Sequence, residues 1–445
     1  MGEVRRAYDH LSLDLLTAND KQGVYPASYY AASAKPLPPF PTATGDLTCD
    51  VCVIGGGYTG LSAALHLAQK GYDVVLLEAQ RVGFGASGRN GGQVGTGQRV
   101  EMDNLESMVG LETAKTLWDL SLESVQLVKD LIKSHNMDVV FYDGVIEAAH
   151  RARFVPEYHE YAEHLEKIYG YTKMTALDRD MMNDHVGSPV YHGGTLDMGS
   201  GHLHPLRYAL GLAKAAQAAG VRIFENAKVT GLTHGTTVVI TTDTAQVRAS
   251  HVVMGCNGYL GGLDDSVAKK VMPINNFIAA TETLDDETAK GLIRYNHAVA
   301  DSKFVINYFR LSDDNRMLFG GGESYGYTFP KDIAATVRKP MTEIYPQLKD
   351  VKIDYAWGGT LGITMNRMPH FARIAGNILS ASGYSGHGVA MATLGGKIAA
   401  EAITGQAEKF DVMASVPTQT FPGGSLLRTP LLVAGMLWYS LRDKL

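Results

Sequence analysis

The sequence predicts an α/β protein of about two domains, one of which binds a nucleotide on a parallel, Rossmann-like sheet. The chain has 445 residues, more than a single hydrophobic core usually serves. Residues 49–78 have the pattern strand, helix, strand, with a glycine-rich turn after the first strand, which is the βαβ unit of parallel sheets. A strand-rich stretch at 271–349 separates segments of this nucleotide-binding type, and it predicts the second domain.

Composition and charge argue against several classes of function. The chain is 45% hydrophobic and 19% charged, and its formal net charge is −6. It has no basic block of five or more residues, so we expect no nucleic-acid binding. The first sixteen residues do not resemble a secretory signal, and three cysteines suit a reducing compartment, so we expect a cytoplasmic protein.

Segment boundaries follow from proline content and apolar spacing. Prolines crowd residues 1–47 and favour an extended arm, which Tyr25, Tyr29 and Tyr30 are expected to tie to the surface. We assign 48–100, 191–270 and 352–411 to the nucleotide-binding domain, and 101–190 and 271–351 to the second domain. Residues 412–445 are expected to form an arm or helix packed on the body. The alternative for this apolar tail, which is too short to span a bilayer, is weak contact with a membrane surface.

Local patterns add further expectations. Apolar spacing predicts helices over 101–135, about 152–170 and near 331–345. Asp143 and Gly144 resemble the turn of a β-hairpin. Cys49 and Cys52 lie three apart on a strand, so their side chains are expected on opposite faces, which argues against a metal or redox pair.

The turn after the first strand has the spacing of a dinucleotide site. Gly55, Gly57 and Gly60 form G-x-G-x-x-G between strand and helix, where glycines permit the tight turn, the approach of a pyrophosphate and close packing of the helix. The phosphates would lie at the N-terminus of the helix, where free N–H groups favour negative charge. Glu78 ends the second strand, where its carboxylate suits a ribose diol.

Two later glycine-rich loops indicate FAD rather than NAD. The first loop, "GFGASGRNGGQVG" at 83–95, follows the second strand, and the second, "GYSGHGVAM" at 383–391, opens a helix. Each suits close passage of the backbone along a large ring system, and the N–H groups of the second would stabilise negative charge on a reduced flavin. The residues expected to contact FAD are Gly55, Gly57, Tyr58, Thr59, Gly60, Glu78, Ala79, Arg81, Ala86, Ser87, Arg89, Asn90, Gly91, Gly92, Gln93, Val229, Asn257, Gly258, Arg367, Gly386, His387, Gly388 and Val389.

These motifs resemble a known family of enzymes. The segments "SYYAASA", "CDVCVIGGGYTGLSAALHLA", "GFGASGRNGGQ", "SGHLHPL", "YFRLSDDNRMLFGGG", "NRMPHFARI", "GYSGHGV" and "YSLRDKL" are similar to those of the glycine-oxidase/D-amino-acid-oxidase group of FAD enzymes, in particular its bacterial gamma-glutamylputrescine oxidase branch. The resemblance covers nearly the whole chain. It implies an FAD domain with a parallel sheet and a substrate domain with a mainly antiparallel sheet.

The resemblance also implies a reaction. An amine is oxidised at its C–N bond, the imine hydrolyses to an aldehyde and ammonia, and dioxygen is reduced to hydrogen peroxide. Sarcosine oxidases in this group attach their flavin to a cysteine in the segment that matches 357–367, where this chain has none, so we expect non-covalent FAD. They also place one lysine soon after the loop that matches "GYSGHG", where this chain has Val389, Ala390 and Met391. They place another on the strand that matches "RMLFGGG", where this chain has apolar residues instead. A dehydrogenase with another electron acceptor therefore stays open.

Oxidation of an amine by a flavin needs side chains that enclose and position the amine more than it needs a catalytic acid and base. A site without water lowers the pKa of the ammonium and so supplies the neutral amine. His387 would either contact flavin or substrate or cap the helix after it. Tyr384 and Trp357 would either wall an amine or pack in the core. Arg310 would either bind the α-carboxylate of a gamma-glutamyl group or pair with a nearby aspartate.

Three alternatives remain for the function. The first is oxidation of a gamma-glutamylated or similar primary amine. The second is an FAD oxidase or dehydrogenase of D-amino or N-methyl amino acids, and the third is a flavin-holding protein without activity.

Arg367 and His370 are expected to help hold the flavin. We expect no metal, because His202 and His204 have no evident third ligand.

Overall fold

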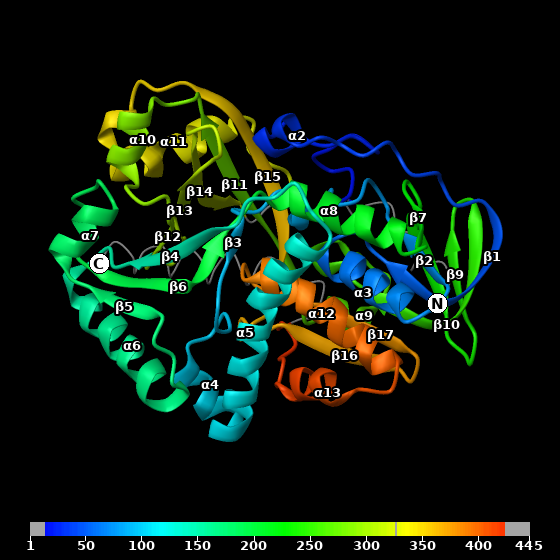
Figure 1. Ribbon diagram of the computed structural model, residues 1–445. Helices are drawn as coiled ribbons and strands as arrows, with labels where there is room; N and C mark the ends of the chain where they lie inside the picture. The colour runs from blue at the N-terminus through cyan, green and yellow to red at the C-terminus, as the bar shows by residue number, and fades with distance from the viewer. Residues whose placement is uncertain (1–13, 325–326, 423–445) are drawn as a thin grey trace.

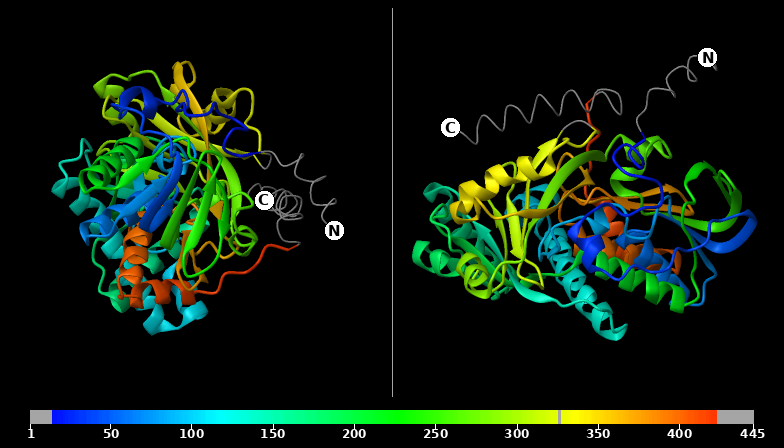
Figure 2. Two further views of the ribbon diagram at one scale, coloured as in Figure 1. Left: turned by 90° about the vertical axis from the view of Figure 1, so that its right-hand side faces the viewer. Right: turned by 90° about the horizontal axis from the view of Figure 1, so that it is seen from above.

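The computed structural model describes residues 14–324 and 327–422, which form two β-sheets with helices packed on both (Figure 1). Within these residues, sheet A has the order β16-β17-β10-β1-β2-β7, with β8 and β9 joined beside β10, and sheet B has the order β15-β11-β14-β13-β12-β4-β6-β3, with β5 beside β6. The view from above in Figure 2 shows the two parts side by side, with the yellow helix α11 on one and the orange helix α12 on the other.

Sheet A is the nucleotide-binding sheet that the sequence predicts. Its strands are β1 (Gly45–Ile54), β2 (Val74–Leu77), β7 (Arg222–Phe224), β8 (Val229–Thr233), β9 (Val238–Thr242), β10 (Ala245–Met254), β16 (His370–Ala375) and β17 (Ile378–Ser382). The central pairs β1–β2, β1–β10, β10–β17 and β2–β7 are parallel. Central strands of this kind are buried on both faces, and the last four residues of β1 and all of β2 are buried.

Sheet B is mainly antiparallel and carries the second part of the molecule. Its strands are β3 (Gln93–Val94), β4 (Tyr142–Ala148), β5 (Met174–Leu177), β6 (Gly194–His202), β11 (Met272–Thr281), β12 (Ala298–Asp301), β13 (Tyr308–Leu311), β14 (Met317–Ser324) and β15 (Ile353–Ile363). Only the pair β4–β12 is parallel among those described. The two sheets confirm the predicted fold class.

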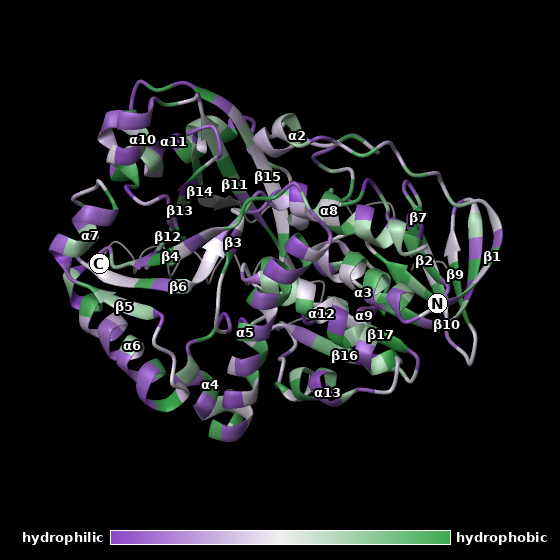
Figure 3. Ribbon diagram, in the orientation of Figure 1, coloured by the Kyte–Doolittle hydropathy of each residue, from purple (hydrophilic) through white to green (hydrophobic). Residues whose placement is uncertain are grey.

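The helices pack on the sheets through apolar faces. They are α2 (Tyr29–Ser33), α3 (Tyr58–Gln69), α4 (Met102–Val109), α5 (Leu111–Ser134), α6 (Val155–Tyr169), α7 (Arg179–His185), α8 (Pro205–Ala218), α9 (Asp265–Ala268), α10 (Asp286–Leu292), α11 (Ile333–Ile344), α12 (Gly388–Ile403) and α13 (Glu408–Ser415). Helix α3 packs between α8 and α12, and α5 lies beside α12 between the two parts (Figure 1). The outer helix α6 is purple and green along its length in Figure 3, as expected for one solvated and one buried face.

The sheets divide the chain differently from the predicted boundaries. Strand β6 falls in the segment assigned to the nucleotide-binding domain, but it pairs with β3, β4 and β5 in sheet B. Strand β15, assigned in the same way, pairs with β11 along the edge of sheet B. Both segments are long strands that lead into sheet A elements. Their local sequence therefore marks them as strands without identifying the sheet to which they belong.

Two local predictions are wrong. Asp143 and Gly144 lie within β4, where the register against β6 shifts, and form no hairpin turn. Gly144 has φ +100° and passes against the ring of His297, so the glycine serves a bulge. Cys49 and Cys52 both face the core between β1, β9 and β10, because the backbone N–H groups of residues 50 and 51 both bond to the Asp73 carbonyl and shift the alternation of β1. Both thiols are free.

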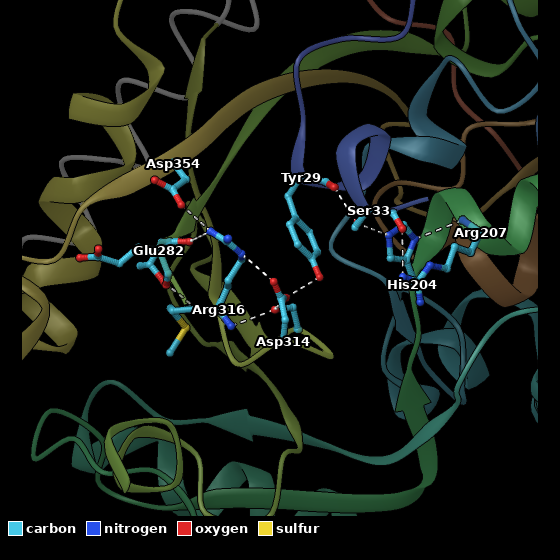
Figure 4. Close-up of polar contacts among 11 residues, drawn as sticks. Tyr29, Ser33, His204, Arg207, Glu282, Asp314, Arg316 and Asp354 are labelled. Carbon is cyan, nitrogen blue, oxygen red and sulfur yellow. Dashed lines mark hydrogen bonds and ion pairs between the residues drawn. The ribbon is translucent and has the colours of Figure 1, made fainter. Parts of the chain in front are cut away.

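The N-terminal arm is tied down by its tyrosines, as predicted. The Tyr25 hydroxyl donates to the Val82 carbonyl at 2.7 Å, and Tyr30 is fully buried. Figure 4 shows Tyr29 donating to Asp314, at 2.6 Å, beside the ion pair of Asp314 with Arg316.

The same short helix α2 also reaches the base of α8. Ser33 contacts His204 at 3.0 Å, and its carbonyl accepts from Arg207 (Figure 4). The arm therefore bridges both parts of the molecule. The apolar stretch 430–439 lies outside the described residues.

Candidate functional site

One large cavity, with a volume of about 1070 Å³, is lined by the ends of strands from both sheets. It begins at the turn after β1, passes the loop at 84–93 and the turn at 384–389, and ends against sheet B. Its volume lies at the upper limit of the roughly 300–1,000 Å³ that ligand pockets usually have. An extended, two-part ligand is what this shape suits.

The turn after β1 presents the free N-terminus of α3 to the cavity. Gly57 occupies the N-cap position without a side-chain cap, and the N–H of Tyr58 donates to the Ser87 hydroxyl at 3.0 Å. A Cβ on Gly57 would lie 2.9 Å from that hydroxyl, and one on Gly60 would overlap the Gly55 carbonyl. Glycine is therefore required here, and the turn leaves room for a diphosphate at the start of the helix.

Glu78 lies at the end of β2 and faces the same part of the cavity. Its carboxylate accepts from the N–H of Gly56 at 2.5 Å and from the N–H of Gln80 at 2.8 Å. Burial raises the pKa of Glu78 to about 7, although both backbone bonds favour its ionised form. A fixed carboxylate beside the diphosphate position is the group that a ribose diol requires.

The loop after β2 is held by its own side chains. Asn90 donates to the carbonyls of Ala86 and Ser87 and accepts from the N–H of Gly92. Arg89 folds back over the ring of Phe84, donates to the Phe84 carbonyl at 2.7 Å and pairs with Asp20 of the arm at 2.9 Å. Both residues still line the cavity, but their polar groups mainly fix the loop.

The turn before α12 forms the opposite wall. The Tyr384 hydroxyl bonds to the Thr59 hydroxyl at 2.7 Å, and His387 contacts the Gly97 carbonyl at 3.1 Å. His387 is at the N-cap position of α12, but its side chain makes no capping bond. Burial lowers the pKa of His387 to about 4, and the charge of Arg99 contributes, so the ring is neutral near pH 7.

The structure brings most of the predicted residues to the cavity. Its lining includes Gly55, Gly57, Tyr58, Thr59, Glu78, Ala79, Ala86, Ser87, Arg89, Asn90, Gly91, Gln93, Val229, Asn257, Arg367, Tyr384, Gly386, His387, Gly388 and Val389. Gly60, Arg81, Gly92, Gly258, Arg310 and Trp357, which were also expected at the site, do not line it. His370 lies on β16 outside the lining as well.

The residues behind the wall have structural partners. Arg81 pairs with buried Glu225 at 2.7 Å. A Cβ on Gly258 would approach the Leu361 carbonyl to 2.9 Å, so this glycine serves the contact with β15. The Trp357 indole donates to the Arg89 carbonyl at 3.0 Å and packs on Tyr30, so it supports the loop after β2 on the side away from the cavity.

Arg310 does not form the aspartate pair considered from sequence, and it does not line the cavity. Its guanidinium is buried and makes no ion pair with Asp313 or Asp314, which pair instead with Arg207 and Arg316. It donates to the Gly91 carbonyl at 2.7 Å, to the Leu311 carbonyl at 3.1 Å and to the Tyr30 hydroxyl at 3.3 Å. Arg310 therefore holds the back of the loop.

Several lining residues were not singled out from sequence. At the sheet B end they include Arg99, Glu147, Asn276, Ala300, Phe304, Ile306, Tyr308 and Tyr327. They come from separate strands and loops without a shared motif, so no single pattern in the sequence marked them. Cys256 lines the nucleotide end, and burial raises the pKa of its thiol to about 12.

Neither a metal centre nor a membrane span is found in the part of the chain that the structure describes. Over residues 14–324 and 327–422, three or more His, Cys, Asp or Glu side chains nowhere gather in a way that could hold a metal. His202 bonds to the Asn296 carbonyl at 2.7 Å, and His204 accepts from the N–H of Arg207 as the cap of α8. No helix among these residues is long and apolar enough to cross a bilayer.

Comparisons with known proteins identify the family of the chain. Residues 50–402 match the family model "FAD dependent oxidoreductase". The chain is 42% identical to gamma-glutamylputrescine oxidoreductase of Escherichia coli (strain K12), over 94% of this chain and 98% of the relative, and 41% identical to the probable oxidoreductase OrdL of Rhizobium meliloti, over 94% and 97%. The resemblance stated from the motifs is thereby confirmed.

Solved structures share the fold. Glycine oxidase from Geobacillus kaustophilus matches with a TM-score of 0.69 at 19% identity, over 80% of this chain and 95% of that one. L-proline dehydrogenase from P. horikoshii matches with a TM-score of 0.65 at 21% identity, over 82% and 94%. The family match spans most of the chain and includes every glycine-rich turn of the cavity, so the protein belongs to the family of FAD-dependent oxidoreductases.

Proposed function

We propose that the protein oxidises a primary amine, gamma-glutamylputrescine or a similar gamma-glutamylated amine, to an aldehyde and ammonia with reduction of dioxygen to hydrogen peroxide. One observation carries the proposal in the structure: the cavity continues from the nucleotide turn to a chamber walled by sheet B. The relative named gamma-glutamylputrescine oxidoreductase, which matches over 94% of this chain and 98% of its own length, supports the choice of amine.

The chamber suits an amine that reacts in its neutral form. Its walls include Ala300, Phe304, Ile306 and Tyr308, and apolar surroundings lower the pKa of a bound ammonium. FAD, when bound, accepts the hydride from the carbon next to nitrogen. Among the chain's own residues, Gly55, Gly57 and Glu78 would hold its nucleotide half.

The turn before α12 would orient the reacting groups without exchanging protons. His387 is neutral, as its lowered pKa requires, and the hydroxyl of Tyr384 is bonded to Thr59 with its pKa raised by burial. Water then adds to the imine that the oxidation leaves. The overall change is amine, water and dioxygen to aldehyde, ammonia and hydrogen peroxide, which balances in atoms and electrons.

We also propose that FAD is held without a covalent bond. Residues 357–367 contain no cysteine, and Cys256 lines the cavity at the nucleotide end, where its thiol donates to the Ile54 carbonyl. Acid precipitation of the protein is expected to release all of the yellow chromophore into the supernatant. Flavin that stays with the pellet would contradict this.

The electron acceptor has a second candidate. Among the described residues that line the cavity, Lys228 is the lysine present, and it pairs with Asp14 at the nucleotide end. The resemblance implies lysines near the flavin in sarcosine oxidases, so their absence from the rest of the described cavity lining supports, as the alternative, a dehydrogenase that passes electrons to another acceptor.

Anaerobic mixing with a panel of amines, followed by admission of air, tests both parts of the proposal. Gamma-glutamylputrescine is expected to bleach the flavin absorbance, and air is expected to restore it with release of peroxide. Bleaching by sarcosine or D-alanine instead would favour the alternative of D-amino or N-methyl amino acids. Bleaching that air does not reverse would favour a different acceptor, and no bleaching by any amine would overturn the proposed activity.

A further inference from the structure

Two side chains of opposite charge line the sheet B end of the cavity. Glu147 is on β4, in register with Ala300 of β12 and Thr195 of β6. Arg99 follows β3 and comes two residues after Gly97, whose carbonyl contacts His387. Both side chains are half-buried, and both border the chamber in which the substrate is expected.

Neither of these charged side chains makes a hydrogen bond or an ion pair within contact distance in the described part of the protein. Three other carboxylates act on Glu147: Glu101, which is exposed and also feels the charge of Arg99, and the hydrogen-bonded Asp197 and Asp301. Asp197 accepts from Tyr171, Thr96, Ser200 and the N–H of Gly199, and Asp301 accepts from two groups of Asn307. No hydrogen bond or ion pair is recorded for the side chain of Arg99 or Glu147 within residues 14–324 and 327–422. Charged groups held away from water without partners are costly, so such a pair inside a cavity indicates a ligand that carries both charges.

The electrostatics show that the two groups influence one another. Burial raises the pKa of Glu147 to about 7, and the charge of Arg99 opposes that rise. Arg99 also helps to lower the pKa of His387, so its charge acts both on the carboxylate and on the turn before α12. The two groups therefore share one end of the chamber.

We propose that Arg99 and Glu147 form a subsite for an α-amino acid group, in which Arg99 binds the carboxylate and Glu147 binds the ammonium. This rests on the proposed function, because a gamma-glutamyl amine carries this zwitterion at the end opposite its reactive amine. The guanidinium suits a carboxylate, since it donates two parallel N–H bonds. A free diamine carries no carboxylate and would place a cation against Arg99, so the same subsite would reject it.

Substrate analogues test each half of the subsite separately. Glutarylputrescine lacks only the α-ammonium, and 4-aminobutanoylputrescine lacks only the α-carboxylate. In the wild-type protein, each deletion is expected to lower kcat/KM for flavin reduction roughly 10- to 100-fold, the range of charge-assisted hydrogen bonds. The effect is expected mainly in KM, because the subsite is remote from the reacting carbon.

Variants assign the two charges to residues. In Arg99→Gln, the analogue without the carboxylate should have the same kcat/KM as gamma-glutamylputrescine. The analogue without the ammonium should still show the reduction in kcat/KM that it shows with the wild-type protein. Glu147→Gln should show the reverse pattern. Asp143→Asn is the matched control, since Asp143 is exposed on the same strand and pairs with Lys129, and it should keep the wild-type pattern. Bound-flavin absorbance and thermal unfolding verify that each variant is folded.

The outcomes separate this inference from the proposed function. If the wild-type protein oxidises gamma-glutamylputrescine but both variants keep the wild-type factors for both analogues, the subsite lies elsewhere and the inference is overturned. If the wild-type protein oxidises no gamma-glutamyl amine at all, the proposed function fails, and the inference with it. If each variant loses the reduction in kcat/KM for one analogue and keeps it for the other, Arg99 binds the carboxylate and Glu147 binds the ammonium.

Discussion

Replacement of Arg310 with methionine distinguishes the role expected from sequence from the one that the structure indicates. As a substrate ligand, Arg310 would affect amine binding and leave the flavin in place. In the structure, the guanidinium is behind the loop at 89–92 and donates to the Gly91 carbonyl at 2.7 Å. We therefore expect Arg310→Met to weaken FAD binding, although the substituted residue does not touch the cavity.

The size of the effect follows from the bonds that are lost. A buried carbonyl left without its donor costs about 1–3 kcal/mol, which corresponds to a roughly 5- to 150-fold higher Kd for FAD. The bonds to the Leu311 carbonyl and the Tyr30 hydroxyl also disappear, so the apoprotein should lose stability as well. Removal of an unpaired buried cation offsets part of this loss.

Titration of apoprotein with FAD, followed by urea unfolding of the apo form, measures both quantities. Arg248→Met serves as the control, because Arg248 forms an exposed pair with Asp46 at 3.4 Å and should cost less than about 1 kcal/mol. If Arg310→Met binds FAD as tightly as the wild type but loses affinity for the amine, the structural assignment is wrong and the sequence-based role is correct.

Three further predictions follow from the same site. Gly57→Val should yield protein without flavin, because even a Cβ lies 2.9 Å from the Ser87 hydroxyl; a flavin spectrum equal to wild type would refute the role of this turn. Asp20→Asn should speed FAD release several-fold, because it removes the charge paired with the buried Arg89 guanidinium; an unchanged rate in stopped-flow displacement would show that the arm does not secure the loop. The kcat/KM for gamma-glutamyl amines should rise with pH through about 7, as Glu147 ionises and attracts the α-ammonium, and Glu147→Gln should remove that limb; a limb that persists in the variant belongs to another group.

The parts of the site that sequence could predict are those set by local backbone geometry. The turn at 55–60 needs glycine because of contacts within the same βαβ unit, so its spacing alone identifies it. Glu78 follows for the same reason, since the end of β2 lies beside that turn. The helices predicted over 101–135, about 152–170 and near 331–345 also depended only on apolar spacing, and the structure has α4, α5, α6 and α11 there.

The residues that were expected at the site but do not line the cavity depend on partners far away in the chain. Arg310 is 219 positions from Gly91, and Trp357 is 268 positions from Arg89, so no local pattern could reveal either contact. Strand β6 was placed in the wrong sheet for a related reason, because a strand's own sequence does not name its neighbour. Glu147 was missed because a single acid on a strand has no motif. Its proposed role in substrate binding depends on Arg99, which lines the same cavity.

The loop at 89–91 is consequently the part of the site on which the most distant segments converge. Asp20 of the arm pairs with Arg89, Trp357 of β15 donates to the Arg89 carbonyl, and Arg310 of β13 donates to the Gly91 carbonyl. These supports come from the arm and from two strands of sheet B, whereas the nucleotide turn belongs to sheet A. A loop held from both sides keeps a fixed position relative to the chamber only while the two sheets stay docked. The arm and sheet B thus contribute to cofactor binding through this loop, although most of their residues never meet the cavity.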